Sequence, residues 1–379
     1  MTISWGANCK DIIYHYFMKY IFSSLILSVF ILSSCSDSKN TNIPNASGLT
    51  GDIFLIMDST QWEGPLGEVL DSLFGAEMEG LPRAETIYNM RWIDPRKLNF
   101  VLKQRRNLIF AVSLDQRTSG AGYVKRLFTK ESVDQIKANP NLFSQNAQDV
   151  FAKGQEVVYL FSATEEQLIQ HIRKNGKKLI EYFDLRERER LTASLFKSKQ
   201  VKVVSQTLRK DFQCDLKIPF GYELVMNNEE FLWVRQINPK DDKNIFLSRK
   251  KYTSQEQFTL DSLINWRDEI CQKYLYGDPE RSDTYLVTET NVDHKPVITK
   301  EISFNKKFAV EIRGLWRTNN FVMGGPFVSY ALVDEPKGVI YYIEGFTFSP
   351  GKDQREIMRE LETILYTFRI SSELPPPAK

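Results

Sequence analysis

Residues 327–348 read Phe-Val-Ser-Tyr-Ala-Leu-Val, then Asp-Glu-Pro-Lys-Gly, then Val-Ile-Tyr-Tyr-Ile-Glu-Gly-Phe-Thr-Phe. Two runs rich in β-branched and aromatic residues flank a short segment with Pro336 and Gly338, which is typical of a turn. Strands joined by so short a connection run antiparallel. The stretch therefore predicts a β-hairpin with strands at 327–333 and 339–348.

The same patterns extend outward from this hairpin. Asn227-Asn228 separates two further apolar runs, 218–225 and 231–235, and predicts a second hairpin. Thr164 with Gln167 forms a capping box that starts a helix, and Asn175-Gly176 is expected to end it. Other strands are expected at 52–57, 86–93, 107–114, 156–161, 245–247, 284–287 and 308–315, and other helices at 65–74, 177–196, 260–274 and 351–367.

These elements predict an α+β protein with mainly antiparallel sheets and packed helices. A charged helix is expected to end near 197–206, where strand-rich sequence begins. We therefore expect an N-terminal α+β domain at 51–200 and a C-terminal one at 201–372, two sandwich-like halves, followed by a loose tail at 373–379. A single sheet shared by both halves is the alternative arrangement.

The composition limits the classes of function. The formal net charge is +2, and hydrophobic residues make up 42% of the chain. There is no basic excess to drive nucleic-acid binding, and the apolar content is ample for a folded core. The short basic cluster Lys103-Gln104-Arg105-Arg106 is interpreted as a solvated helix end.

The strongest motif lies near the start of the chain. Lys19 precedes an apolar run that ends in Leu32-Ser33-Ser34-Cys35. The run of about 13 residues would span roughly 20 Å as a helix, too little for a hydrocarbon core about 30 Å thick. This pattern predicts a lipoprotein signal peptide at 1–34, with Cys35 acylated as the first residue of the mature chain. An uncleaved anchor and an ordinary signal peptide are the alternatives.

Two segments flank this signal. Met18-Lys19 resembles a normal start for such a peptide, so 1–17 is interpreted as an overlong start. Residues 35–50 contain Ser, Asn, Thr, Lys, Pro and Gly with little apolar content, and they are expected to form a flexible tether. Because a mature lipoprotein carries two or three acyl chains, its body would be held firmly at a membrane surface.

Cysteine and histidine are sparse in the body. Cys214 and Cys271 would close a loop of nearly 60 residues if they paired, stabilising the fold by roughly 4 kcal/mol in the chain-entropy model. Two separate buried thiols are the alternative. His171 and His294 stand alone, so neither a metal site nor a cofactor is expected.

One patch is a candidate binding site. Arg313, Trp316 and Arg317 are followed by Gly324 and Gly325. Glycine pairs allow close approach of a ligand, while the tryptophan and the arginines suit a sugar face or an anion. The alternative is structural, with Gly324-Gly325 in a tight turn and Trp316 in the core.

A second candidate is a pair of carboxylates. Glu311 and Glu344 lie on neighbouring predicted strands. Two carboxyl groups facing one cleft would serve as acid and base on a glycoside. The alternative is that both lie on the solvated face of an antiparallel sheet.

Several motifs resemble an uncharacterised family of Bacteroidetes lipoproteins known only as a domain of unknown function. They are the signal that ends in Cys35, Trp62-x-Gly64-x-x-Gly67, Ile218-Pro219-x-Gly221-Tyr222, Phe231-x-Trp233-x-Arg235, Arg313-Gly314-x-Trp316, Met323-Gly324-Gly325-Pro326-Phe327 and Gly345-Phe346-x-Phe348-x-Pro350. The resemblance implies a cell-envelope lipoprotein at the outer membrane, without a known activity or cofactor. Residues 218–252 and the closing strand–helix unit also resemble the α/β/α sandwich of Mog1 and PsbP-like proteins, and fold alone does not imply function.

The sequence thus favours a non-catalytic envelope module. It would be anchored to the membrane through Cys35 and would bind an unknown envelope protein, glycan or lipid. The alternative is an envelope hydrolase that acts on glycan or peptidoglycan with Glu311 and Glu344.

Overall fold

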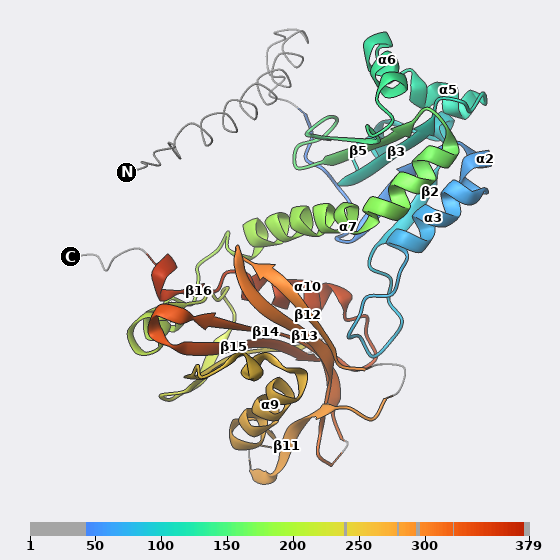
Figure 1. Cartoon of the computed structure of the whole chain (residues 1–379). Helices are drawn as coiled ribbons and strands as arrows, with labels where there is room; N and C mark the ends of the chain where they lie inside the picture. The colour runs from blue at the N-terminus through green and yellow to red at the C-terminus, as the bar shows by residue number, and fades with distance from the viewer. Residues whose placement is uncertain (1–42, 239–240, 279, 293–295, 321, 375–379) are drawn as a thin grey trace, which may run out of the picture. The chain divides into compact units, whose positions relative to one another are not determined.

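This computed structural model describes residues 43–238, 241–278, 280–292, 296–320 and 322–374. The chain divides into two units, Met1–Pro44 and Asn45–Lys379, and all elements named below belong to the second. Its strands form a five-stranded sheet, a nine-stranded sheet and one two-stranded pair (Figure 1). No helix in these residues has the length and apolar character needed to cross a bilayer.

The five-stranded sheet lies in the N-terminal half and is largely parallel. Its order is β2-β1-β3-β5-β4. β1 pairs in parallel with β2 and β3, β3 pairs in parallel with β5, and β4 runs antiparallel to β5. The strands are β1 (Asp52–Ile56), β2 (Asn89–Ile93), β3 (Asn107–Ser113), β4 (Ser144–Gln148) and β5 (Glu156–Ser162).

Helices cover both faces of this sheet, which is why β1 and β3 are buried over their whole length. One face holds α3 (Pro65–Phe74) and α7 (Glu165–Leu195), and the other holds α5 (Ser119–Lys125) and α6 (Lys130–Ala138). The short helices α2 (Ser59–Trp62) and α4 (Phe100–Lys103) lie in the β1–β2 and β2–β3 connections.

The predicted helix break at Asn175-Gly176 is wrong. α7 starts at the predicted cap, where Gln167 N donates to Thr164 Oγ1, and it runs without interruption through Gly176. Gly176 is buried against α3, and a Cβ there would lie 2.7 Å from Leu73 Cδ1. The glycine therefore allows two helices to approach closely and does not end one.

The nine-stranded sheet is antiparallel and contains both predicted hairpins. Its order is β10-β11-β13-β14-β15-β9-β8-β7, with β12 also paired to β13. The strands are β7 (Glu223–Asn227), β8 (Phe231–Ile237), β9 (Asp242–Lys251), β10 (Tyr276–Asp278), β11 (Arg281–Glu289), β12 (Ile298–Phe304), β13 (Lys307–Thr318), β14 (Gly324–Asp334) and β15 (Val339–Phe348). The predicted α+β class with mainly antiparallel sheets is confirmed.

One face of this sheet carries α9 (Leu260–Tyr274), and the other carries α10 (Arg355–Leu365) (Figure 1). Val204 of α8 (Lys202–Thr207) also packs in the core on the α10 face. Because side chains alternate along a strand, neighbouring residues serve different cores. On β14, Tyr330 packs in the α10 core, whereas Ala331 packs in the α9 core. This alternation decides which of the candidate site residues can meet.

The two body cysteines are free, buried thiols, so of the two arrangements considered from the sequence, a Cys214–Cys271 disulfide or separate thiols, the structure has the second. Cys214 belongs to the α10 core and Cys271 to the α9 core, with the sheet between them. Burial raises the pKa of the Cys271 thiol to about 12. Cys214 lies in β6 (Cys214–Asp215), which pairs with β16 (Arg369–Ile370) and follows α8 (Lys202–Thr207).

The segment that leads into β2 contacts the start of α10. The Glu85 carboxylate accepts the amide protons of Gln354 and Arg355 at 2.7 and 2.9 Å. Arg355 donates to Thr86 O at 2.8 Å, and Arg359 donates to Ile87 O at 2.6 Å. A carboxylate at a helix N-terminus and arginines on backbone carbonyls hold this segment against α10.

Residues 45–47, which were expected to be part of the flexible tether, also contact the body. Ala46 N donates to Lys153 O, and Ser47 N donates to Gln104 O. The signal peptide and Cys35 lie outside the described residues.

Candidate functional site

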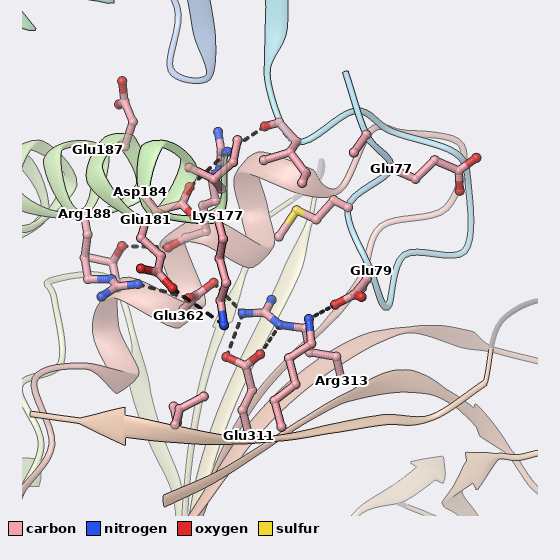
Figure 2. Close-up of a pocket in the computed structure, with 18 of the residues that line it drawn as sticks. Glu77, Glu79, Lys177, Glu181, Asp184, Glu187, Arg188, Glu311, Arg313 and Glu362 are labelled. Atoms are coloured by element: carbon pink, nitrogen blue, oxygen red, sulfur yellow. Dashed lines mark hydrogen bonds and ion pairs between the residues drawn. The ribbon is translucent and has the colours of Figure 1, made fainter. Parts of the chain in front are cut away.

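A cavity of about 800 Å³ opens between α7, residues 76–79, and the β12–β13–α10 side of the nine-stranded sheet (Figure 2). This volume lies within the usual range for ligand sites. The charged residues that line the cavity are Glu77, Glu79, Glu181, Asp184, Glu187, Glu301, Glu311 and Glu362, together with Lys177, Arg188, Lys300, Arg313 and Arg359. Carboxylates thus outnumber cations by eight to five.

The floor of the cavity is an ion-pair network between β13 and α10. Arg313 binds Glu311 through two hydrogen bonds of 2.8 and 3.0 Å and contacts Glu362 at 3.1 Å. The other oxygen of Glu362 accepts from Arg188 of α7 at 3.2 Å. The guanidinium of Arg188 also lies 3.5 Å from the centre of the Tyr366 ring. The network therefore joins α7 to α10 and β13.

The opposite charges of Glu362, Glu311, Arg313 and Arg188 keep the buried groups of this network ionised. Burial raises the pKa of Glu362, but Arg313 and Arg188 outweigh it, so the pKa lies below that of an ordinary glutamate. Burial likewise opposes the charge on Arg313, yet Glu362 and Glu311 hold its pKa well above the usual value. A buried pair of this kind is costly to break from one side.

A second group occupies the wall formed by α7. Asp184 accepts from the Tyr88 hydroxyl at 2.6 Å and lies 3.7 Å from Arg359. Burial raises the pKa of Asp184, against the opposing effects of Tyr88 and Arg359. Arg359 stacks on the Tyr88 ring with 4.5 Å between the guanidinium carbon and the ring centre.

The rim is exposed and acidic. Lys300 pairs with Glu79, and Lys177 lies 3.8 Å from Glu181 on α7. Glu301 is exposed and forms no ion pair with the residues that the structure describes. Glu187 lines the cavity but points away from it (Figure 2), because Asn107 and Arg190 bind its carboxylate. The remaining carboxylates still outnumber the cations by seven to five.

The structure separates the two carboxylates proposed as an acid–base pair. Glu311 pairs across the sheet with Tyr330 on the α10 face, whereas Glu344 pairs with Ser329 on the α9 face. Glu344 is fully buried and bound by both nitrogens of the Arg267 fork, at 2.8 and 2.9 Å. Because a sheet lies between them and each is held by an arginine, they cannot act on one substrate.

The predicted binding patch is also divided between the faces of the sheet. Trp316 is buried in the α9 core, where its ring centre lies 5.5 Å from that of Phe346. Gly324 and Gly325 begin β14 and do not form the tight turn that was the alternative. Arg317 pairs with Glu289 at 2.8 Å. Of this patch, Arg313 alone lines the cavity.

No sequence motif marks Arg188, Arg359 and Glu362 as site residues. Each of these residues is a charged residue on a helix, beside the buried apolar stripe of that helix. This position is the only indication in the sequence that they belong to the site. His171 stacks on Phe143, with 4.9 Å between the ring centres, and its Nε2 donates to Pro140 O at 2.7 Å. His294 lies outside the described residues.

No group of three His, Cys, Asp or Glu side chains in the described residues is placed to hold a metal ion.

A second cavity, of about 840 Å³, shares Arg188 and Thr363 with the first. Its charged lining is Arg188, Arg209, Lys217, Lys306 and Arg369 against Glu189, Asp215 and Glu373. It is therefore basic, in contrast to the acidic cavity.

Replacing Glu362 by glutamine is expected to lower the free energy of unfolding by about 2 kcal/mol at pH 7. The native pKa of Glu362 lies below its unfolded value, so its contribution is present above the unfolded pKa and is lost as the pH falls through the native pKa. The difference between Glu362→Gln and the parent should therefore shrink at pH 3.

Chemical denaturation at pH 7 and pH 3 measures this effect. The exposed Glu335→Gln is the control and should match the parent at both values. An equal difference at pH 7 and pH 3 for Glu362→Gln would show that Glu362 is not held charged by its arginines.

Comparisons with known proteins match both halves of the chain to uncharacterised families. Residues 46–196 match the family model described as a domain of unknown function (DUF8532). Residues 201–367 match a second, also described as a domain of unknown function (DUF4837). No curated protein is similar to the chain. The resemblance to a domain of unknown function is thus confirmed, while its lipoprotein and Bacteroidetes aspects remain predictions.

Among solved structures, two Mog1 chains align with part of this chain. A mutant of protein Mog1 aligns at 6% identity and a TM-score of 0.27, over 42% of this chain and 91% of that chain. The Saccharomyces cerevisiae Ran-binding protein Mog1p aligns at 6% identity and a TM-score of 0.26, over 42% and 90%. At these TM-scores the likeness carries no argument about function.

Proposed function

We propose that this chain is a lipid-anchored, non-catalytic binding module of the cell envelope. Its mature form begins at an acylated Cys35, and its ligand occupies the acidic cavity. The anchor is supported by Leu32-Ser33-Ser34-Cys35 after a short apolar run. The resemblance to envelope lipoproteins supports the outer membrane as its location.

The charges that line the acidic cavity support the proposal that it binds a ligand. Its buried arginines are already paired with carboxylates on its floor and wall. The surplus charge lies on the rim, where Glu181 and Glu301 are exposed. A site whose fixed cations are compensated and whose rim is acidic favours a ligand that brings positive charge. We therefore assign the cavity to a cationic, amine-bearing ligand, such as a basic segment of a partner protein.

The lining does not favour the alternative of a glycan hydrolase. That function needed two carboxyl groups across one cleft, with one of them available to protonate the substrate. Glu311 is bound by Arg313 and Tyr330, and Glu344 lies on the other face of the sheet. A cavity whose carboxylates are bound in ion pairs supports ligand binding better than it supports acid–base catalysis.

A trilysine peptide tests the proposal by isothermal titration calorimetry at low ionic strength, where surface charges are least screened. We expect trilysine to bind the mature chain and triglutamate not to bind. Glu181→Gln with Glu301→Gln should weaken trilysine binding by about three- to tenfold, because each removes one exposed charge from the rim.

The matched control is Glu256→Gln with Glu335→Gln, which removes two exposed carboxylates that do not line the cavity. This control should leave trilysine binding unchanged. Equal binding of the two peptides, no binding of either, or equal effects of the two double variants would contradict the assignment.

A further inference from the structure

The body meets the segment that follows Cys35 at one defined place. Asn45 bridges to Lys153 in the loop before β5, and Ser47 bridges to Arg105 in the loop before β3. Cys35 and Asn45 are ten positions apart. Even a fully extended segment of that length spans at most about 35 Å. Acyl chains on Cys35 would therefore hold this side of the body close to the bilayer.

Large apolar side chains are exposed beside this place. Phe100 is 72% exposed and Val101 is 57% exposed, both on α4, whose last residue is Lys103. Val150 is 38% exposed, three residues before Lys153. Neighbouring exposed apolar side chains of this size are unusual on a soluble surface and mark interaction sites.

Unpaired cations accompany these apolar side chains. Lys103, Arg105 and Lys153 form no ion pair with the residues that the structure describes. Gln155 Nε2 donates to the backbone carbonyls of Lys103 and Arg105, which ties the two loops together. Lys103 also lies 5.5 Å from the centre of the Phe151 ring. Cations beside an exposed aromatic are the combination that binds anionic headgroups and inserts at the interface.

We propose that Phe100, Val101, Val150, Lys103, Arg105 and Lys153 form a membrane-docking surface that rests on anionic lipid headgroups. Phe100 and Val101 enter the interface, and the three cations contact the lipid phosphates. The acyl chains then supply the affinity, and this surface sets the orientation of the body. The proposal rests on the proposed acylation of Cys35.

A fluorescent reporter tests this docking. The acylated chain carrying Val150→Cys is labelled with an NBD group and placed in nanodiscs of phosphatidylglycerol and phosphatidylcholine that contain doxyl-labelled lipid. The native thiols Cys214 and Cys271 are fully buried, so labelling is directed to the new cysteine. A label at Phe220→Cys, which is 71% exposed before β7, is the control.

We expect doxyl lipid to quench the label at position 150 by at least half and to leave the label at position 220 unaffected. Phe100→Ser with Val101→Ser should abolish most of this quenching without unfolding the protein, because both side chains are exposed. Lys103→Glu with Lys153→Glu, or removal of phosphatidylglycerol, should reduce it similarly.

Equal quenching at positions 150 and 220, or quenching that survives both double variants, would overturn the docking surface. Intact mass of the same sample separates this from a failure of the anchor. An acylated chain without quenching at position 150 contradicts the docking surface alone. A chain without acyl groups contradicts the proposed anchor and this inference with it.

Discussion

Replacing Glu344 by alanine is expected to lower the free energy of unfolding by about 3–5 kcal/mol. Glu344 and Arg267 are 0% and 1% exposed, and they are joined by hydrogen bonds of 2.8–3.2 Å. Arg267 also donates to Thr288, and Tyr342 donates to Glu344 at 2.9 Å. Removing the carboxylate leaves a guanidinium buried under α9 without its counter-charge, and that is the source of the cost.

An exposed ion pair provides the control for Glu344→Ala. Arg281 and Asp283 are 2.8 Å apart, with side chains 60% and 68% exposed. Asp283→Ala should change the unfolding free energy by less than about 0.5 kcal/mol. The double variant Arg267→Met with Glu344→Leu should recover much of the loss, because apolar residues of similar volume replace the buried pair.

Urea denaturation followed by circular dichroism measures all three variants. If Glu344→Ala proves as mild as Asp283→Ala, the pair is not buried in solution, and the placement of α9 on the sheet is wrong.

The second large effect is expected for Gly67→Ala. Gly67 lies in the first turn of α3, where a Cβ would be 1.8 Å from the Trp62 carbonyl oxygen. Trp62 ends α2 and stacks on Trp92 with 6.2 Å between the ring centres. Because the atom in the way belongs to the backbone, α2 and α3 would have to separate. We expect a loss of about 3 kcal/mol or more in the unfolding free energy.

Gly122→Ala is the matched control for Gly67→Ala. Gly122 lies in α5, and no atom lies within 4 Å of its added Cβ. Alanine there should be neutral or stabilise the protein by up to about 1 kcal/mol, because alanine has the higher helix propensity. Thermal unfolding should then rank Gly122→Ala at or above the parent and Gly67→Ala well below it. A stable Gly67→Ala would contradict the close contact between α2 and α3.

Local patterns predicted individual elements well and their arrangement less well. The hairpin around residues 334–338 and the helices at 65–74 and 260–274 match the structure because turn residues and apolar spacing are local properties. The parallel pairing of β1 with β2 and β3 was not predicted, since a fully buried strand shows the same apolar run in either direction. The expected break at Gly176 failed because its close neighbour, Leu73, is distant in sequence.

The candidate site was predictable only in part, for a related reason. Glu311 and Arg313 lie two positions apart on one strand, so the sequence places both on the same face. It could not place Glu344 relative to them, because that depends on the register of β14 and β15. Arg188 and Glu362 enter the cavity from two helices, and only the folded chain brings them together.

Mass spectrometry of the N-terminal peptide from the native protein tests the central claim most directly. The account predicts a mature chain that begins at Cys35 and carries acyl chains on that residue. Cys35→Ala should instead yield a precursor that retains the signal peptide up to Ser34 and carries no acyl group. A native chain recovered with its signal peptide still attached to an unmodified Cys35 would contradict the account.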